Sequence, residues 1–439
     1  MMGKQNKQMQ MIILDIESMI PEKHLLRQIK NCVNFDFIYE KAAPYYSNIG
    51  RKSIDPVILM KMLLVGYLYG IKSERRLEEE ISLNLAYRWF CQIDLMDKVP
   101  DHSTFSQNRR RRFHDDQIFR ELFNGIVLQC IEKGIVSGEA VADGSFLPAN
   151  VSLKSSVESI EIIQQSTIRY LEELEAEMSA IPGYQASVPV EVQKRTLKSV
   201  TDPDCGYINQ KNKKGLGYLT EMTVDTAHGI ITGVDCYPAN HRESDLILNH
   251  IKKQKYAINY PIHKLALDGG YDVGAVHRGL ELLGIDGYTA IRVYQNNALK
   301  KGFSYDSEKD CFVCERGNHL NFNRIVFKKS SMNYYRLYMC PRKACSDCPN
   351  LSHCEIDKGS IRINASANYP AFHRNKLKYE TAEYLRMMRL RKIWAEGTFA
   401  VLKREHNLKT IKKRGIHRAS EECLLSAVAL NLKRMIKVA

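Results

Sequence analysis

Three acidic residues far apart in the chain have the type and the setting for metal-assisted chemistry: Asp143, Asp268 and Glu396. Asp143 and Asp268 lie in or just after short apolar runs typical of strands, whereas Glu396 lies in a helical segment flanked by basic residues. Carboxylates supply the hard oxygen ligands that Mg²⁺ prefers, and two such ions about 4 Å apart promote the cleavage and joining of phosphodiesters. The three residues therefore predict a catalytic two-metal site in which one carboxylate bridges both ions.

Small and basic neighbours favour this interpretation. A glycine follows each aspartate directly and leaves room for a phosphate to approach closely. Lys403 comes seven residues after Glu396, so both lie on one face of a helix, and Lys403 is a candidate for binding phosphate. Taken alone, an Asp-Gly pair is usually a turn, and a glutamate on a basic helix is usually an ion-pair partner. The combination of all three on one basic chain favours the metal site.

The overall charge predicts a polyanionic partner. The 439 residues carry a formal net charge of +14, and the pI is near 9.1. Such a balance favours nucleic acid first and a membrane surface second. No apolar run reaches the roughly 18 residues that suggest a membrane span. The first residues do not form a signal peptide, so we expect a cytoplasmic protein without a membrane partner.

Two basic segments are candidates for contact with double-stranded DNA. One is an arginine-rich helix that follows two predicted helices, an arrangement typical of compact DNA-binding bundles. The other runs from Arg391 to Arg418 and holds nine basic and two acidic residues, which suits a phosphate track. The alternative for both is a solvated basic surface. The predicted DNA-binding residues are Arg109, Arg110, Arg111, Arg112, Lys392, Lys403, Arg404, Lys412, Lys413 and Arg414.

The hydrophobic pattern divides the chain into four parts. Residues 1–135 are predicted to form an all-helical DNA-binding domain. Residues 136–293 alternate strands with helices and predict a mixed sheet flanked by helices, with a helical insertion at 151–212. Residues 294–378 hold a cysteine cluster and little predicted regular structure, and residues 379–439 return to the core as helices. The expected class is therefore α/β, with an N-terminal helical domain and an inserted cysteine-rich module.

Six of the 12 cysteines lie between Cys311 and Cys354. The closest-spaced four fit tetrahedral Zn²⁺ in a structural site, and they are Cys340, Cys345, Cys348 and Cys354. Cys311, Cys314, His319 or His353 could take one of the four places, so the ligand set stays open. An Fe–S cluster and unligated thiols are the alternatives.

Several segments, in this order along the chain, resemble those of bacterial insertion-sequence transposases with a DDE catalytic core. They are PDHSTFSQNRRRR, VADGSFLPANVS, LALDGGYD and AEGTFAVLKREHNLKTIKKRG. The resemblance implies an RNase H-like fold with a mixed five-stranded sheet. It implies Asp143 on the first strand, Asp268 after the fourth, and Glu396 on a helix beyond the fifth.

The same resemblance implies cutting of double-stranded DNA at element ends and strand transfer into target DNA, with Mg²⁺ or Mn²⁺ as cofactor and a homodimer on DNA. Similar transposases carry a cysteine-bearing insertion, which supports a structural role for that module. One departure concerns the tyrosine and arginine that often precede the catalytic glutamate, because this chain has Arg389 and Lys392 there. A lysine cannot make the bidentate contact of a guanidinium group.

Two alternatives to transposition stay open. One is a metal-dependent DNA nuclease on the same fold, which cuts without joining. The other is a domesticated DNA-binding protein with an inactive core, against which the three intact acidic residues argue.

Overall fold

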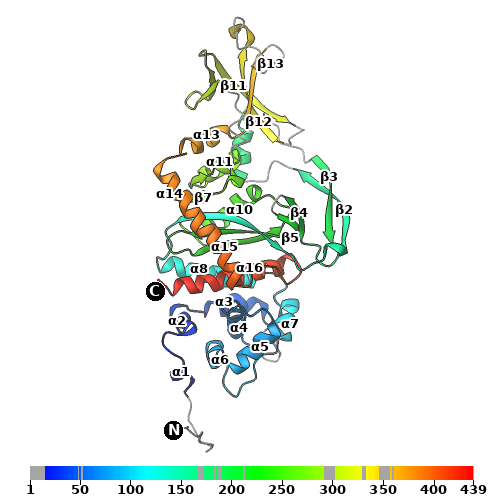
Figure 1. Cartoon of the computed structure of the whole chain (residues 1–439), viewed down its shortest axis with the longest axis vertical. Helices are drawn as coiled ribbons and strands as arrows, with labels where there is room; N and C mark the ends of the chain where they lie inside the picture. The colour runs from blue at the N-terminus through cyan, green and yellow to red at the C-terminus, as the bar shows by residue number, and fades with distance from the viewer. Residues whose placement is uncertain are drawn as a thin grey trace, which may run out of the picture.

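The structure is a computed structural model that describes residues 15–47, 49–50, 53–165, 172–181, 184, 190–210, 213–290, 302–328, 333–345, 356–357 and 360–438. Figure 1 shows an elongated molecule with N-terminal helices at one end, a central sheet with its helices in the middle, and a second sheet at the other end. Among the described helices, none combines the length and apolar character that crossing a membrane requires.

The described N-terminal region is helical, as predicted. Its helices are α1 (Ile16–Met19), α2 (Leu25–Cys32), α3 (Phe37–Ala42), α4 (Pro56–Leu68), α5 (Glu74–Leu83), α6 (Leu85–Cys91), α7 (Ser103–Arg111) and α8 (Gln117–Glu132). The side chain of Asp55 accepts hydrogen bonds from two backbone N–H groups in the first turn of α4, and Pro56 opens that helix. Helix α4 is apolar on nearly every side because other helices surround it.

The central sheet has six strands. They are β1 (Glu139–Pro148), β4 (Gly206–Gln210), β5 (Lys213–Asp225), β6 (Ile231–Pro238), β7 (Lys264–Leu267) and β8 (Asp286–Thr289). Strand β1 pairs antiparallel with β5 and parallel with β7, which pairs parallel with β8. Strands β4 and β6 both pair with the other edge of β5. The sheet is mixed, as predicted, but it has six strands rather than five because the long strand β5 also pairs with β4.

Alternate residues of β5 show which helices cover each face of this sheet. Thr223 Oγ1 lies 2.9 Å from Nε2 of His250, which belongs to α10 (Glu243–Ala257). Thr220 Oγ1 lies 3.2 Å from Sγ of Cys423, which belongs to α16 (Ile416–Met435). The two long helices therefore lie on opposite faces, and α11 (Gly274–Leu282) packs beside α10.

Helix α16 joins the N-terminal helices to the sheet. Every residue from Ala419 to Leu432 is buried, and the helix packs against α8, α4 and β6 (Figure 1). The chain reaches α16 through α13 (Tyr369–Leu377), α14 (Ala382–Arg391), the π-helical turn η6 (Lys392–Glu396) and α15 (Gly397–Glu405). The C-terminal helices thus pack onto the central sheet and the N-terminal helices.

The insertion at 151–212 differs from the prediction of a helical segment. In its described part, strands β2 (Ser156–Gln165) and β3 (Val190–Ser199) form a two-stranded antiparallel ribbon, and the helical residues are a 3-10 turn at Leu153–Ser155 and α9 (Glu172–Ser179). The sequence SVESIEIIQQ is rich in β-branched residues, which favour a strand when a partner strand is available. The helical prediction was therefore wrong for most of the described insertion.

The cysteine-rich region forms a second six-stranded sheet, so the prediction of little regular structure was wrong. Its strands are β9 (Phe303–Asp306), β10 (Cys311–Cys314), β11 (His319–Lys328), β12 (Asn333–Pro341), β13 (Ile356–Asp357) and β14 (Ser360–Ser366). Phe312 and Tyr338 are fully buried in a small aromatic core, with ring centroids 4.9 Å apart. This core gives the region a scaffold of its own.

Candidate active site

Asp143, on β1, and Asp268, directly after β7, lie beside each other in the parallel register of the two neighbouring strands. Val141 of β1 pairs with Ala266 of β7. Asp143 and Asp268 each follow two residues later in the same direction, so they are level with each other and their side chains start from the same face of the sheet. Asp143 Oδ1 accepts a hydrogen bond from the next backbone N–H at 2.9 Å. Asp268 begins a short 3-10 turn, and its Oδ1 accepts from the backbone N–H of Gly270 at 2.6 Å.

The surroundings of Asp143 oppose its ionisation. Burial, followed by the charges of Asp268 and Glu243, raises the pKa of Asp143 to about 7, and Arg391 acts in the opposite direction. A divalent cation would relieve this repulsion, because it binds the deprotonated carboxylate. Two adjacent carboxylates in a largely buried setting are a hard-oxygen donor set, so these residues fit Mg²⁺ or Mn²⁺.

Glu396 lies at the end of η6, which packs against β1 and β5. Its side chain is 63% exposed, and its Oε1 lies 3.8 Å from Nη2 of Arg391. In the described part of the chain, the three predicted carboxylates do not all lie within 4.8 Å of one another. Two ions about 4 Å apart need ligands spread over a wider space than one ion does. The turn with Glu396 packs against β1, which carries Asp143, but these described carboxylates do not form one tight group.

A tryptophan anchors η6 to the β5–β6 hairpin. The ring of Trp394 lies 2.2 Å from the point where a Cβ on Gly229 would stand, and Gly229 has a φ of +76°. Only glycine adopts that conformation readily and leaves that space. Arg434 lies over the same ring, 5.5 Å from its centroid, and donates to Thr398 Oγ1 at 2.9 Å. π-helical turns often mark functional positions. The contacts of Trp394 with Gly229 and Arg434 hold η6 in place against the hairpin.

Lys403 faces the same part of the sheet as Asp143. Its Nζ donates to Oγ of Ser145 at 2.8 Å, and Ser145 lies two residues beyond Asp143 on the same side of β1. Burial, followed by the charge of Lys213, lowers the pKa of Lys403, while Asp143 raises it. The lysine predicted to bind phosphate therefore lies close to the aspartates.

Sequence reasoning missed two acidic residues next to this site. Glu243, in the first turn of α10, projects its carboxylate toward Gly144 and Gly270. Glu221 of β5 is fully buried, and burial raises its pKa, with further contributions from the neighbouring carboxylates. A glutamate in the first turn of a helix that follows a strand was the available signal for Glu243. No sequence signal distinguished Glu221.

Arg109 is largely buried at the edge of a cleft and held in ion pairs, so it is not the exposed basic residue that the arginine-rich helix predicts. Its guanidinium group lies 2.6 Å from Glu421 Oε1 and 2.7 Å from Glu74 Oε1, and the Glu421 side chain is fully buried. Although burial alone would raise the pKa of Glu421, Lys413 and Arg109 lower it to about 2. Arg109 is therefore a structural ion-pair residue that joins α7 to α16.

The other predicted DNA-binding residues differ in exposure. The side chains of five are exposed: Arg110, Arg111, Lys392, Arg404 and Arg414. Arg112 lies 4.7 Å from the centroid of the Tyr46 ring. Lys413 lies 2.6 Å from Glu421 and thus shares the buried pair. A cleft of about 540 Å³ lies between α4, α5, α7 and residues 407–422. Its charged lining residues are Lys72, Arg109, Arg110, Lys412, Lys413 and Arg418, with two carboxylates, Glu74 and Glu422. The cleft brings the two predicted basic segments together.

The described part of the cysteine cluster is compact. Cys340 and Cys345 are buried neighbours, and burial followed by Cys345 raises the pKa of Cys340 to about 11, with a smaller contribution from Cys314. Neighbouring thiols of this kind fit a soft cation such as Zn²⁺, which binds them as thiolates. Cys311 contacts His319 instead, at 3.3 Å from Sγ to Nδ1. The predicted ligands Cys348 and Cys354 lie outside the described residues.

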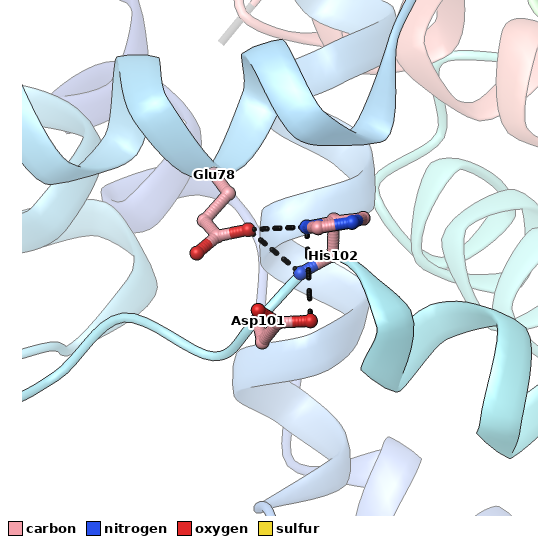
Figure 2. A group of neighbouring side chains, drawn as sticks. All are labelled: Glu78, Asp101 and His102. Carbon is pink, nitrogen blue, oxygen red and sulfur yellow. Dashed lines mark hydrogen bonds and ion pairs between the residues drawn. The ribbon is translucent and has the colours of Figure 1, made fainter.

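Figure 2 shows a different group of possible metal ligands in the N-terminal helices: Glu78, Asp101 and His102. Their ligand atoms lie within 4.8 Å of one another. Arg75 Nε donates to His102 Nε2 at 3.2 Å, so His102 Nδ1 carries the proton and donates to Glu78 Oε2 at 2.8 Å. The backbone N–H of His102 donates to the same oxygen at 2.8 Å. The group thus fastens the start of α7, and a neighbouring arginine opposes a cation there.

Comparisons with known proteins agree with the transposase motifs. A family model described as a transposase domain (DUF772) matches residues 14–111, and a transposase DDE domain model matches residues 313–436, which include Glu396. A comparison with curated proteins gave no match.

Solved structures show weaker similarity. A piggyBac transposase synaptic complex with hairpin DNA is 10% identical, with a TM-score of 0.41, over 94% of this chain and 75% of that chain. A Mos1 transposase paired-end complex with the left transposon end is 10% identical, with a TM-score of 0.18, over 60% of this chain and 67% of that chain. Likenesses this low carry no argument about function. The two family models, by contrast, confirm the resemblance that the motifs indicated: the chain is a relative of the DDE-type transposases.

Proposed function

We propose that the chain is a DNA transposase that cuts phosphodiester bonds at the ends of an insertion element and joins those ends to target DNA. Asp143, Asp268 and Glu396 are the proposed catalytic residues and metal ligands. The observation that carries this proposal is the adjacency of Asp143 on β1 and Asp268 directly after β7, with η6 packed against β1. Carboxylates from two strands and one helix form a donor set for two hard cations.

The proposal includes an RNase H-like fold for the catalytic core, made of residues 136–293 and 379–439. Counted without the insertion strands β2 to β4, the core strands in chain order are β1, β5, β6, β7 and β8. Asp143 then lies on the first strand, Asp268 directly after the fourth, and Glu396 beyond the fifth. That order supports the division into a helical domain at 1–135, the core, and the cysteine-rich insertion at 294–378.

Bound Mg²⁺ or Mn²⁺ would activate the attacking water or 3′-hydroxyl and stabilise the leaving oxygen. In this scheme the chain's own residues orient the substrate. Asp143 and Asp268 form the rigid side of the site, because one is part of β1 and the other directly follows β7. Lys403, held by Ser145 beside Asp143, is placed to bind a phosphate oxygen. Glu396 is exposed, so its carboxylate can turn toward the aspartates when DNA approaches.

Double-stranded DNA is the proposed partner, bound as element ends and as target by a homodimer. The basic cleft between α7 and residues 407–422 supports this contact, because it gathers positive side chains from both ends of the chain. Arg110, Arg111, Arg404 and Arg414 are exposed and are the proposed phosphate contacts. Binding through such contacts weakens as salt rises.

The cysteine-rich sheet is proposed to hold a structural Zn²⁺ through Cys340 and Cys345, with Cys348 and Cys354 completing the predicted set. The buried thiols of Cys340 and Cys345 support this proposal. Cys314, which interacts with Cys340, is the first candidate if one of the other two does not bind.

A strand-transfer assay tests the proposed function. The purified protein is incubated with end-bearing DNA, a target plasmid and Mg²⁺, and products are compared with those of Asp268→Asn. Joined products that disappear in the variant support a transposase, and cuts without joining support the nuclease alternative. DNA binding without any cleavage in the wild-type protein would support the domesticated DNA-binding alternative. Cleavage that survives in Asp268→Asn would refute the assignment of the site.

A further inference from the structure

The carboxylate of Glu243 occupies a small space beside the two aspartates. Its Cδ and Oε1 lie 2.8 Å from the point where a Cβ on Gly144 would stand, and its Oε2 lies 3.4 Å from the corresponding point on Gly270. Asp268 Oδ1 lies 2.7 Å from that second point. The carboxylates of Glu243 and Asp268 therefore border one space, which remains open because both neighbouring residues are glycines.

A fully buried carboxylate on the face of the sheet toward which Glu243 projects supplies an independent observation. Glu221 of β5 lies directly opposite Gly144 of β1, so its side chain lies on the face that α10 covers. Tyr271 donates to Glu221 Oε2 at 2.7 Å, whereas Glu221 Oε1 is buried without a hydrogen-bond partner. A buried acceptor without a donor is destabilising, so this oxygen is suited to bind a cation directly or to accept a hydrogen bond from its bound water.

Lys213 forms an ion pair with Glu243. Its Nζ lies 3.1 Å from Glu243 Oε1, and the Glu243 side chain is 21% exposed. One ammonium group balances one carboxylate, whereas Glu243 shares its surroundings with the acidic side chains of Asp143, Asp268 and Glu221. Lys213, together with Arg391 and Lys403 near Asp143, supplies three positive groups for these four carboxylates, and a divalent cation would balance the remainder.

We propose that Glu243 is a fourth carboxylate of the metal centre formed by Asp143 and Asp268, and that Lys213 holds it in place until a divalent cation binds. The proposal rests on the proposed function, because it takes the two aspartates as metal ligands. The competing interpretation is an ordinary ion pair at the start of α10, which would have no effect on metal binding.

Metal binding without DNA tests the proposal directly. Mn²⁺ is titrated into the full-length protein and followed by isothermal titration calorimetry and by the electron paramagnetic resonance of free Mn²⁺. Glu243→Gln should weaken Mn²⁺ binding at least about tenfold, since even supporting residues of metal sites have effects of that size. Asp245→Asn is the matched control, because it removes the same charge from the same helical turn, and it should leave binding unchanged.

Two further variants separate the possible failures. Asp268→Asn should also weaken Mn²⁺ binding; if it does and Glu243→Gln does not, the role of Glu243 is refuted and the proposed function stands. If neither variant affects binding, the metal centre of the proposed function is refuted. Lys213→Met should strengthen Mn²⁺ binding by releasing Glu243, and it provides the test if Glu243→Gln does not fold. Unchanged or weaker binding in Lys213→Met would overturn the proposal.

Discussion

Replacing Arg109 with alanine is expected to destabilise the fold and to leave the intrinsic affinity for DNA nearly unchanged. The Arg109 guanidinium group donates to both carboxylate oxygens of Glu421, at 2.6 to 2.9 Å. The Glu421 side chain has no exposed surface, and Glu74 contacts the guanidinium group from the other side. The substitution therefore removes the partner of a buried charge rather than a surface contact.

The expected loss of stability follows from this geometry. Removing one partner of a buried ion pair costs about 3–5 kcal/mol, because the remaining charge stays buried. Lys413 remains 2.6 Å from Glu421, so the loss should lie at the lower end, about 3 kcal/mol. At about 2.1 cal/mol/K per residue, the unfolding entropy of 439 residues is roughly 0.9 kcal/mol/K. The midpoint of cooperative thermal unfolding should then fall by about 3 °C.

The neighbouring Arg110 offers a matched control on the same helix, because its side chain is exposed. Both alanine variants are compared by urea and thermal unfolding and by DNA binding at several salt concentrations. Arg110→Ala should keep its stability and weaken DNA binding, with a shallower salt dependence. The reverse pattern, with weakened DNA binding and full stability in Arg109→Ala, would refute the assignment of Arg109 to the core.

Three other predictions concern pH, the anchor of η6 and the cysteine cluster. Burial lowers the pKa of His406 from 6.5 to about 4, so its contribution to stability is complete above pH 6.5 and is lost as the pH falls toward 4. That pKa change corresponds to about 3 kcal/mol of stability. His406→Asn should therefore reduce the pH dependence of the unfolding free energy between about pH 4 and 6.5, measured by urea unfolding at several pH values. Gly229→Val would place a side chain against Trp394; we expect a red shift of tryptophan emission and loss of DNA cleavage with DNA binding retained, and unchanged emission would contradict this. Cys340→Ser should reduce the zinc content of the purified protein and destabilise the second sheet, whereas wild-type zinc content would exclude Cys340 as a ligand.

The positions of Asp143 and Asp268 on adjacent strands agree with a reading of the sequence, whereas the position of Glu243 could not be read from it. Short apolar runs locate the strands that carry the aspartates, because strand periodicity is local. A glutamate in a first helical turn is common, since its negative charge interacts favourably with the positive end of the helix dipole. Its closeness to the aspartates depends on how α10 packs over the sheet, which no local pattern records.

Arg109 and Arg110 show the same limit at neighbouring positions. The two residues are identical in type, and a basic helix alone predicts DNA contact for both. They differ because the partner of Arg109, Glu421, lies 312 residues later in the chain. The strands of the 151–212 insertion were missed for a related reason, since a β-branched segment becomes a strand only when a partner strand pairs with it.

The central position of α16 has a consequence for synthesis of the protein. Chains fold from the N-terminus as they leave the ribosome, yet α4, α8 and β6 pack against a helix that emerges long after them. A frameshift or an early stop before residue 416 would remove the centre of the molecule and expose the apolar surfaces that α16 covers.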